Sequence, residues 1–200
     1  MLFSLTTFAL AATLVVLLPG PDTLVVVRNL LRGGRRMAGR AVLGVLSGLT
    51  VWVVTAALGL SAVLRASHDA YLGLRIAGAM YLIYIGVRSL RSKGEPARSG
   101  RRLVGSGYTS GLLTDLLNPK VGVFFVTFLP GFVPHGYSVG WTSLLFGAIF
   151  VALTAIYFAI LLTASEPVMR WMATAHIRRR TERVTGVVLI GFGLRLALDP

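Results

Sequence analysis

The sequence predicts an all-α membrane protein with six transmembrane helices, arranged as two inverted three-helix repeats. Three observations lead to this prediction. The 200 residues are 55% hydrophobic and only 14% charged, whereas soluble domains carry about 25% charged residues. The apolar residues form long, uninterrupted runs, and the basic residues gather in alternate connections between those runs. Finally, the two halves of the chain resemble each other.

Six apolar runs account for most of the chain. A helix needs about 20 residues to cross roughly 30 Å of hydrocarbon, and the third and sixth runs leave room to extend into their flanks. We do not expect the first run to be a signal peptide, because no basic residue precedes it and no Ala-x-Ala cleavage site follows it. The runs cover Leu5–Val27, Ala41–Leu64, Tyr71–Val87, Gly107–Val133, Val139–Ala164 and Val184–Leu198.

The connections between the runs alternate in charge. Residues 28–40, 88–106 and 165–183 together hold 16 of the 20 Lys and Arg residues. Because basic loops stay in the cytoplasm, we predict these three connections inside and both termini outside. Nucleic-acid binding, which a net charge of +13 suggests in a soluble protein, is the weaker interpretation here, since each basic segment abuts an apolar run.

The two halves of the chain, residues 1–106 and 107–200, each contain three predicted spans. Segment Leu82–Arg88 at the end of the third span resembles Leu189–Arg195 at the end of the sixth. Because three is an odd number, the second half must be inserted upside down relative to the first, as in many secondary transporters. No Pro/Ser-rich linker divides the halves, so we predict one membrane domain. Chance similarity among apolar residues is the alternative.

Proline residues interrupt the first and the fourth span. Proline lacks an amide donor and clashes with the preceding turn, and Asn followed by Pro is typical of a helix start. Such a break must be buried in protein or line a cavity, because lipid cannot satisfy free backbone groups. We therefore predict two half-helix starts near the middle of the bilayer. The motifs are Pro19-Gly20-Pro21-Asp22 in the first span and Asn118-Pro119-Lys120 in the fourth.

Three charged residues accompany these breaks: Asp22, Asp115 and Lys120. A charge at the centre of a membrane helix costs about 2.5–3.5 kcal/mol on insertion scales, so the three predict a polar cavity or mutual pairing. If the two breaks are symmetry mates, Asp22 and Lys120 approach each other and complement the two charges of an amino acid. The alternatives are simple proline kinks, an Asp22 solvated at the cytoplasmic interface, and a Lys120 that snorkels.

Other chemistry finds little support in the sequence. There is no cysteine, and the three histidines lie in connections without metal-ligand spacing, so we expect neither a metal nor another cofactor. We find no reactive constellation of the kind an enzyme needs and do not expect catalysis. A membrane assembly or structural protein without transport, and a transporter of another small solute, are the remaining alternatives.

In its motifs the chain resembles the LysE/RhtB family of amino-acid exporters over essentially its whole length. The resemblance implies a six-helix permease of the bacterial inner membrane that exports amino acids, such as lysine, homoserine, threonine or leucine, using the proton motive force. Family members often have Asn in place of Asp22 and Gln in place of Gly131, which leaves substrate charge and proton coupling open. The matching segments are Pro19–Asp22, Arg32–Gly48, Ala77–Gly86, Gly111–Leu113, Asn118–Lys120, Phe124–Phe125 and Leu129–Phe132.

The expected substrate site therefore lies between the two breaks, where the repeats meet. Asp22, alone or with Asp115, is expected to bind the substrate ammonium or to carry the coupling proton. Lys120 and the half-helix beginning at Pro119 are expected to bind the carboxylate, with alternating access by rocking of the repeats. The expected partners are the amino acid, protons and the lipid bilayer, and a homo-oligomer stays open.

Overall fold

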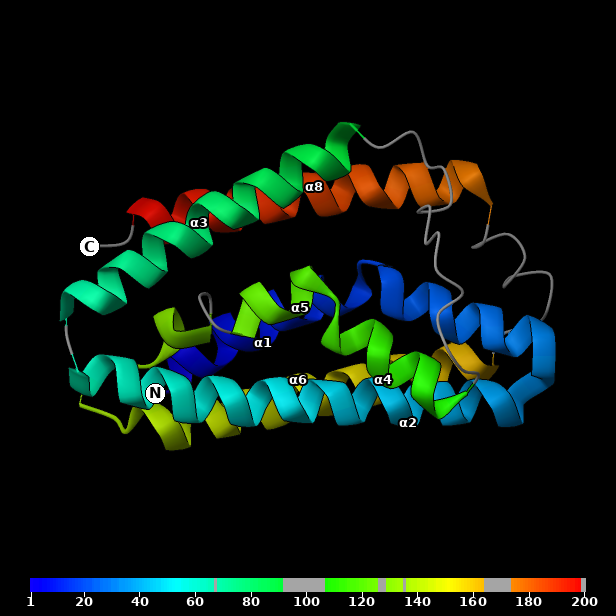
Figure 1. The fold of residues 1–200 in the computed structure, drawn as a ribbon, viewed down its shortest axis with the longest axis horizontal. Coiled ribbons are helices and arrows are strands. Elements are labelled where there is room, and N and C mark those ends of the chain that lie inside the picture. The colour runs from blue at the N-terminus through cyan, green and yellow to red at the C-terminus, as the bar shows by residue number, and fades with distance from the viewer. Residues whose placement is uncertain (67, 92–106, 126–128, 135, 164–173, 199–200) are drawn as a thin grey trace.

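The computed structural model describes residues 1–66, 68–91, 107–125, 129–134, 136–163 and 174–198. Over these residues the fold is helical, and they contain no β-strand (Figure 1). The elements are α1 (Leu2–Leu17), α2 (Pro21–Ala66), α3 (His68–Arg91), α4 (Tyr108–Leu116), α5 (Pro119–Val123), the 3-10 helix η2 (Leu129–Phe132), α6 (Val139–Thr163) and α8 (Ala175–Leu198).

Among the described residues, two helical segments are long and apolar enough, by length and composition, to cross a membrane: Pro21–Gly59 of α2, and α6. The first of these is bent back on itself, because Gly33 and Gly34 leave the helical conformation, with a φ of 66° at Gly34. This left-handed φ suits glycine, and in Figure 1 the chain reverses direction there. The predicted basic connection at residues 28–40 is thus helix on both sides of a glycine turn.

Both predicted breaks occur. α1 ends at Leu17 and α2 begins at Pro21, while α4 ends at Leu116 and α5 begins at Pro119. None of the pieces α1, α4 and α5 exceeds 16 residues, so none of them crosses roughly 30 Å of hydrocarbon alone. The first predicted span therefore consists of α1 followed by the first arm of α2.

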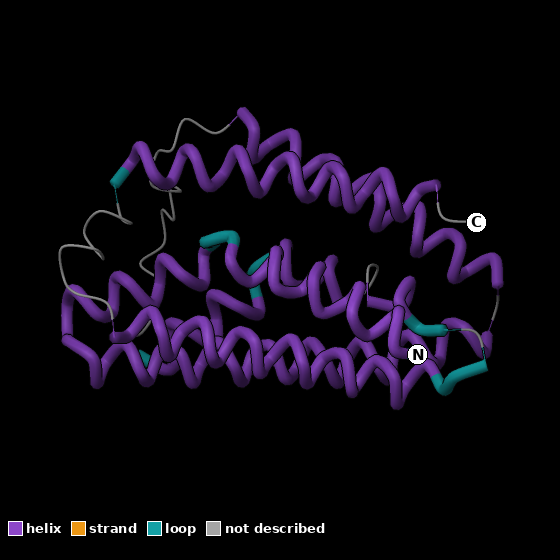
Figure 2. Tube along the Cα trace, turned by 180° about the vertical axis from the view of Figure 1, so that it is seen from behind, coloured by secondary structure: helices purple, strands orange, loops and turns teal. Residues whose placement is uncertain are grey.

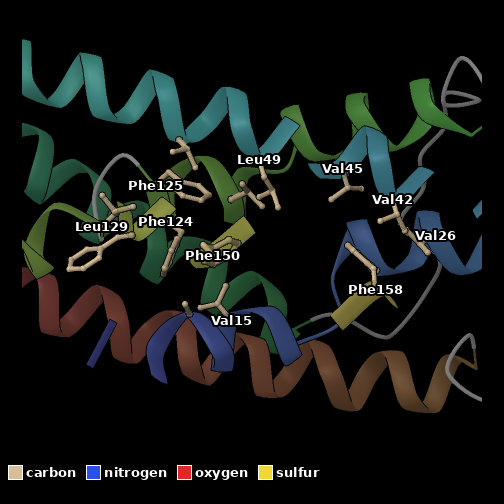
Figure 3. Close-up of a cluster of buried hydrophobic side chains, with 14 of the residues drawn as sticks. Val15, Val26, Val42, Val45, Leu49, Phe124, Phe125, Leu129, Phe150 and Phe158 are labelled. Atoms are coloured by element: carbon tan, nitrogen blue, oxygen red, sulfur yellow. The ribbon is translucent and has the colours of Figure 1, made fainter. Parts of the chain in front are cut away.

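The apolar core falls into two clusters. The larger one joins α1, α2, α5, η2 and α6 and is rich in phenylalanine, with Phe8 stacked on Phe146 at a ring-centroid distance of 4.6 Å. Figure 3 shows part of it, including Phe124, Phe125 and Phe150. The smaller cluster joins α3 and α8, which pack side by side as a pair (Figure 2). The breaks lie against the larger cluster.

Glycines bring the second arm of α2 directly against α4. A Cβ atom at Gly44 would collide with the carbonyl oxygen of Tyr108, and one at Gly111 would collide with that of Ala41. Such small residues allow membrane helices to approach until their backbones touch. This close approach fixes α4, and with it the position of the break that follows.

Candidate functional site

The break after α1 leaves a backbone carbonyl without its helical partner. In an α-helix the carbonyl of residue i accepts a hydrogen bond from the N–H of residue i+4. For Val15 that position is Pro19, which has no N–H. The backbone at Leu18 is extended, with φ −78° and ψ 102°, so the helix ends there. The position of the proline thus determines which carbonyl needs a new donor.

Lys120 supplies this donor. Its Nζ donates to the Val15 carbonyl oxygen at 3.0 Å and to the Leu18 carbonyl oxygen at 3.2 Å. The ammonium also complements the partial negative charge at the C-terminal end of α1. Lys120 therefore does not snorkel towards a headgroup, because its charged end binds the backbone at the break.

Asn118 connects the two breaks through the oxygen and the nitrogen of its side-chain amide. Its Oδ1 accepts a hydrogen bond from the Lys120 N–H at 3.1 Å and so caps α5, as the sequence predicts. Its Nδ2 donates to Oδ2 of Asp22 at 2.8 Å. Asn118 is only 3% exposed. The breaks in α1–α2 and α4–α5 are thus held together by partly buried hydrogen bonds.

Asp22 keeps one carboxylate oxygen without a partner. Oδ2 is bonded to Asn118, whereas Oδ1 is buried and accepts no hydrogen bond from the described residues. Leaving a buried acceptor unsatisfied costs about 1–3 kcal/mol, and more when the group is charged. Such an atom in a native structure calls for an explanation. The alternative of a carboxylate solvated at the interface does not hold for a buried oxygen.

These groups line a cavity of about 40 Å³ between α1, α2, α5 and α6. A water molecule needs about 10–15 Å³ by this measure, so the cavity has room for a few waters in this conformation. Its apolar walls come from valine, leucine and phenylalanine side chains, among them Leu49, Phe150 and Phe158. Its polar side chains are Asp22, Thr23, Asn118, Lys120, Thr154 and Tyr157.

The predicted site residues divide into three groups. The first lines the cavity and consists of Gly20, Asp22, Asn118 and Lys120. The second group forms the helix breaks and consists of Pro19, Pro21 and Pro119. The remaining residue, Asp115, lies outside the cavity lining.

Asp115 is fully buried at the C-terminal end of α4. Neither of its carboxylate oxygens has a hydrogen-bond partner within the described part of the chain, and its side chain packs against Gly48. Its backbone carbonyl accepts a hydrogen bond from the Asn118 N–H at 2.9 Å and lies 3.4 Å from the indole nitrogen of Trp52. Asp115 therefore belongs to the α2–α4 contact beside the break.

Sequence reasoning missed the α6 wall of the cavity. Thr154 and Tyr157 lie on α6, and the Tyr157 hydroxyl is 3.4 Å from the hydroxyl of Thr23 on α2. The two α6 residues are three apart and so share a helix face. Polar residues on one face of an otherwise apolar run are the signal that points to them.

The chain is similar to known membrane proteins over nearly its whole length. The sequence model of the LysE type translocator family matches residues 13–200. The chain is 30% identical to an uncharacterized membrane protein of Bacillus subtilis, over 98% of this chain and 99% of that protein. It is 26% identical to the leucine efflux protein of Salmonella typhimurium, over 96% of this chain and 93% of that protein. No solved structure matches the chain. The chain is therefore a membrane protein that belongs to the LysE type translocator family.

Proposed function

We propose that this protein exports neutral amino acids with an apolar side chain, and that it binds them in the cavity between the two helix breaks. The proposal rests on one observation: a carboxylate oxygen of Asp22 without a hydrogen-bond donor among the described residues and the ammonium of Lys120 belong to residues that line the same cavity. A zwitterion has one ammonium and one carboxylate, and it meets the opposite charge at each of these residues.

Asp22 binds the substrate ammonium in this proposal. Its Oδ1 is a buried acceptor to which no described residue donates, and a substrate ammonium brings three N–H donors. Lys120 binds the substrate carboxylate, since its own ammonium has three donors and the two carbonyls of α1 use two of them. Charge-assisted bonds of this kind are stronger than bonds between neutral groups.

The rest of the cavity lining suits an uncharged side chain. Asp22 and Lys120 balance each other, and the described lining offers no further charge to a third group on the substrate. The walls around Leu49, Phe150 and Phe158 bury apolar surface, which is favourable by roughly 25 cal/mol per Å². The leucine efflux relative is consistent with this substrate class. Because the cavity holds only a few waters, its walls must separate when the amino acid enters.

The inverted-repeat layout is the second part of the proposal, and the contacts of α3 with α8 support it. A Cβ atom at Gly86 would meet Ile190, and a Cβ atom at Gly193 would meet Ile83. Aligning the segment that begins at Leu82 with the one that begins 107 residues later pairs Gly86 with Gly193 and Ile83 with Ile190. The two contacts are thus reciprocal, as a two-fold axis requires.

We place the protein in the bacterial inner membrane, with both termini outside and the three basic connections inside. The proton motive force is the proposed driving force. One charge moving through 100 mV releases about 2.3 kcal/mol, which sustains roughly a 50-fold concentration gradient. Rocking of residues 1–106 against residues 107–200 alternates access to the site.

Amino-acid efflux from dipeptide-loaded cells tests the function. Expression of the protein should speed the release of leucine and similar amino acids, and Asp22→Asn and Lys120→Met should abolish this gain while membrane insertion stays normal. Asp69→Asn, a change at an exposed acid on α3, is the matched control and should export normally. If expression accelerates the efflux of no proteinogenic amino acid, the proposal is wrong. A membrane assembly protein would show this result.

A further inference from the structure

The end of α1 has the features of a site for a monovalent cation. Half-helix C-termini and unwound carbonyls inside membranes bind such cations in transporters, because their oxygens carry partial negative charge. Here the oxygens are the carbonyls of Val15 and Leu18, and the positive group that they hold is the Lys120 ammonium. The ammonium is comparable to a small alkylammonium ion, except that it is covalently tied to α5.

We propose that Lys120 is a built-in cation which occupies this carbonyl site, so that transport needs no bound metal cation, and that the site accepts a free monovalent cation once the lysine head is removed. The expectation that transport needs no metal cation rests on the proposed export function. The expectation that the carbonyl site accepts a free cation does not depend on that function.

The geometry supports an open carbonyl site once the ammonium is gone. Pro19 cannot donate to the Val15 carbonyl, so truncating Lys120 removes the donor without offering a replacement from the helix. The space next to the site is the cavity, whose lining includes Asp22 as a counter-charge. A cation entering from the cavity would find two carbonyl oxygens and a carboxylate close by. Leaving the carbonyls empty costs free energy, because buried acceptors lose a hydrogen bond.

Two substitutions separate the cation site from other roles of the side chain. Lys120→Ala removes the ammonium together with most of the side-chain volume, which opens the site. Lys120→Met also removes the charge but retains a long side chain that fills the space. Only the first variant should therefore respond to added cations.

Thermal unfolding of the purified, detergent-solubilised full chain is the direct test. We expect Lys120→Ala to melt below the wild type and to regain stability when Na⁺, K⁺ or methylammonium replaces the bulky cation N-methylglucamine. A cation present at about ten times its Kd raises the Tm by a few degrees. The wild type and Lys120→Met should melt at the same temperature in all four salts.

The outcomes decide the proposal in either direction. Selective stabilisation of Lys120→Ala by any one of the small cations supports it, as does recovery of folded protein only in their presence. An equal response of Lys120→Met, or no response of Lys120→Ala, overturns it. So does a Lys120→Ala variant that fails to fold in every salt while Lys120→Met folds.

Transport provides the second measurement. Leucine efflux from proteoliposomes by the wild type should be unchanged when N-methylglucamine replaces Na⁺ and K⁺, and a requirement of the wild type for either metal ion overturns the proposal. Wild-type protein that moves no amino acid in any salt would refute the export function instead. In that case the melting experiment still decides the cation site.

Discussion

Exchanging the two partners of the Asn118–Asp22 hydrogen bond tests whether the helix breaks hold each other together. Asn118→Ala removes the cap of α5, which costs about 0.5–2 kcal/mol. It also leaves Oδ2 of Asp22 without its donor at 2.8 Å, which costs about 1–3 kcal/mol for a buried acceptor. We therefore expect this variant to lose about 1.5–5 kcal/mol of unfolding free energy, the sum of the two contributions.

A charge exchange separates the two contributions. Asn118→Asp retains a good helix cap but replaces the amide donor by a second carboxylate facing Asp22. This variant should be strongly destabilised. Adding Asp22→Asn places the amide at position 22 and the carboxylate at position 118, so that one donor and one acceptor face each other again. The double variant should therefore be more stable than Asn118→Asp alone. Because the residues are in contact, we expect a coupling energy of about 1–3 kcal/mol.

Reversible unfolding of the four proteins in mixed detergent measures this coupling. The control pair combines Asn118→Asp with Asp69→Asn, whose exposed carboxylate lies on α3, and these two changes should be additive within about 0.5 kcal/mol. A coupling of Asp22 with Asn118 no larger than that of the control pair would refute the reasoning. The hydrogen bond between the breaks would then contribute nothing to stability.

Three further substitutions, the first with a matched control, test the packing around the site. Gly111→Ala forces a Cβ into a backbone carbonyl of α2 and should lower stability by about 1–3 kcal/mol, whereas Gly39→Ala, with open space around it, should be neutral or stabilising in the same melting assay. Asn29→Ala removes the side chain that binds the Ser110 hydroxyl and the Gly107 N–H at 3.1 and 2.9 Å and should cost about 2–4 kcal/mol of unfolding free energy. Tyr157→Phe should raise the KM for efflux while the Tm changes little, because the lost hydroxyl lines the cavity and makes only a 3.4 Å contact.

The positions of the helix breaks could be predicted from the sequence because they follow from covalent structure. A proline has no N–H wherever it occurs, and an Asn-Pro pair favours a helix start independently of the neighbouring helices. The end of α1 at Leu17 and the start of α5 at Pro119 therefore required no knowledge of tertiary packing. The same reasoning explains why the cap formed by the Asn118 side chain was predictable.

The partners across the breaks depend on tertiary structure and were predicted less well. The expected approach of Asp22 to Lys120 occurs in the sense that both line one cavity, but the bond between the breaks runs through Asn118. Lys120 binds carbonyls of α1, a partner that no periodicity indicates. Thr154 and Tyr157 mark one face of α6, but the sequence does not indicate that this face turns towards the break.

The two motifs are best understood as complementary halves of one arrangement. The proline of the first motif leaves the Val15 carbonyl without a donor, and the lysine of the second supplies one. The asparagine of the second motif caps its own helix and donates to the aspartate of the first. After these exchanges, Oδ1 of Asp22 is still unsatisfied, and its residue lines the cavity. This remaining acceptor supports the proposed substrate site, because a substrate ammonium that entered the cavity would donate to it.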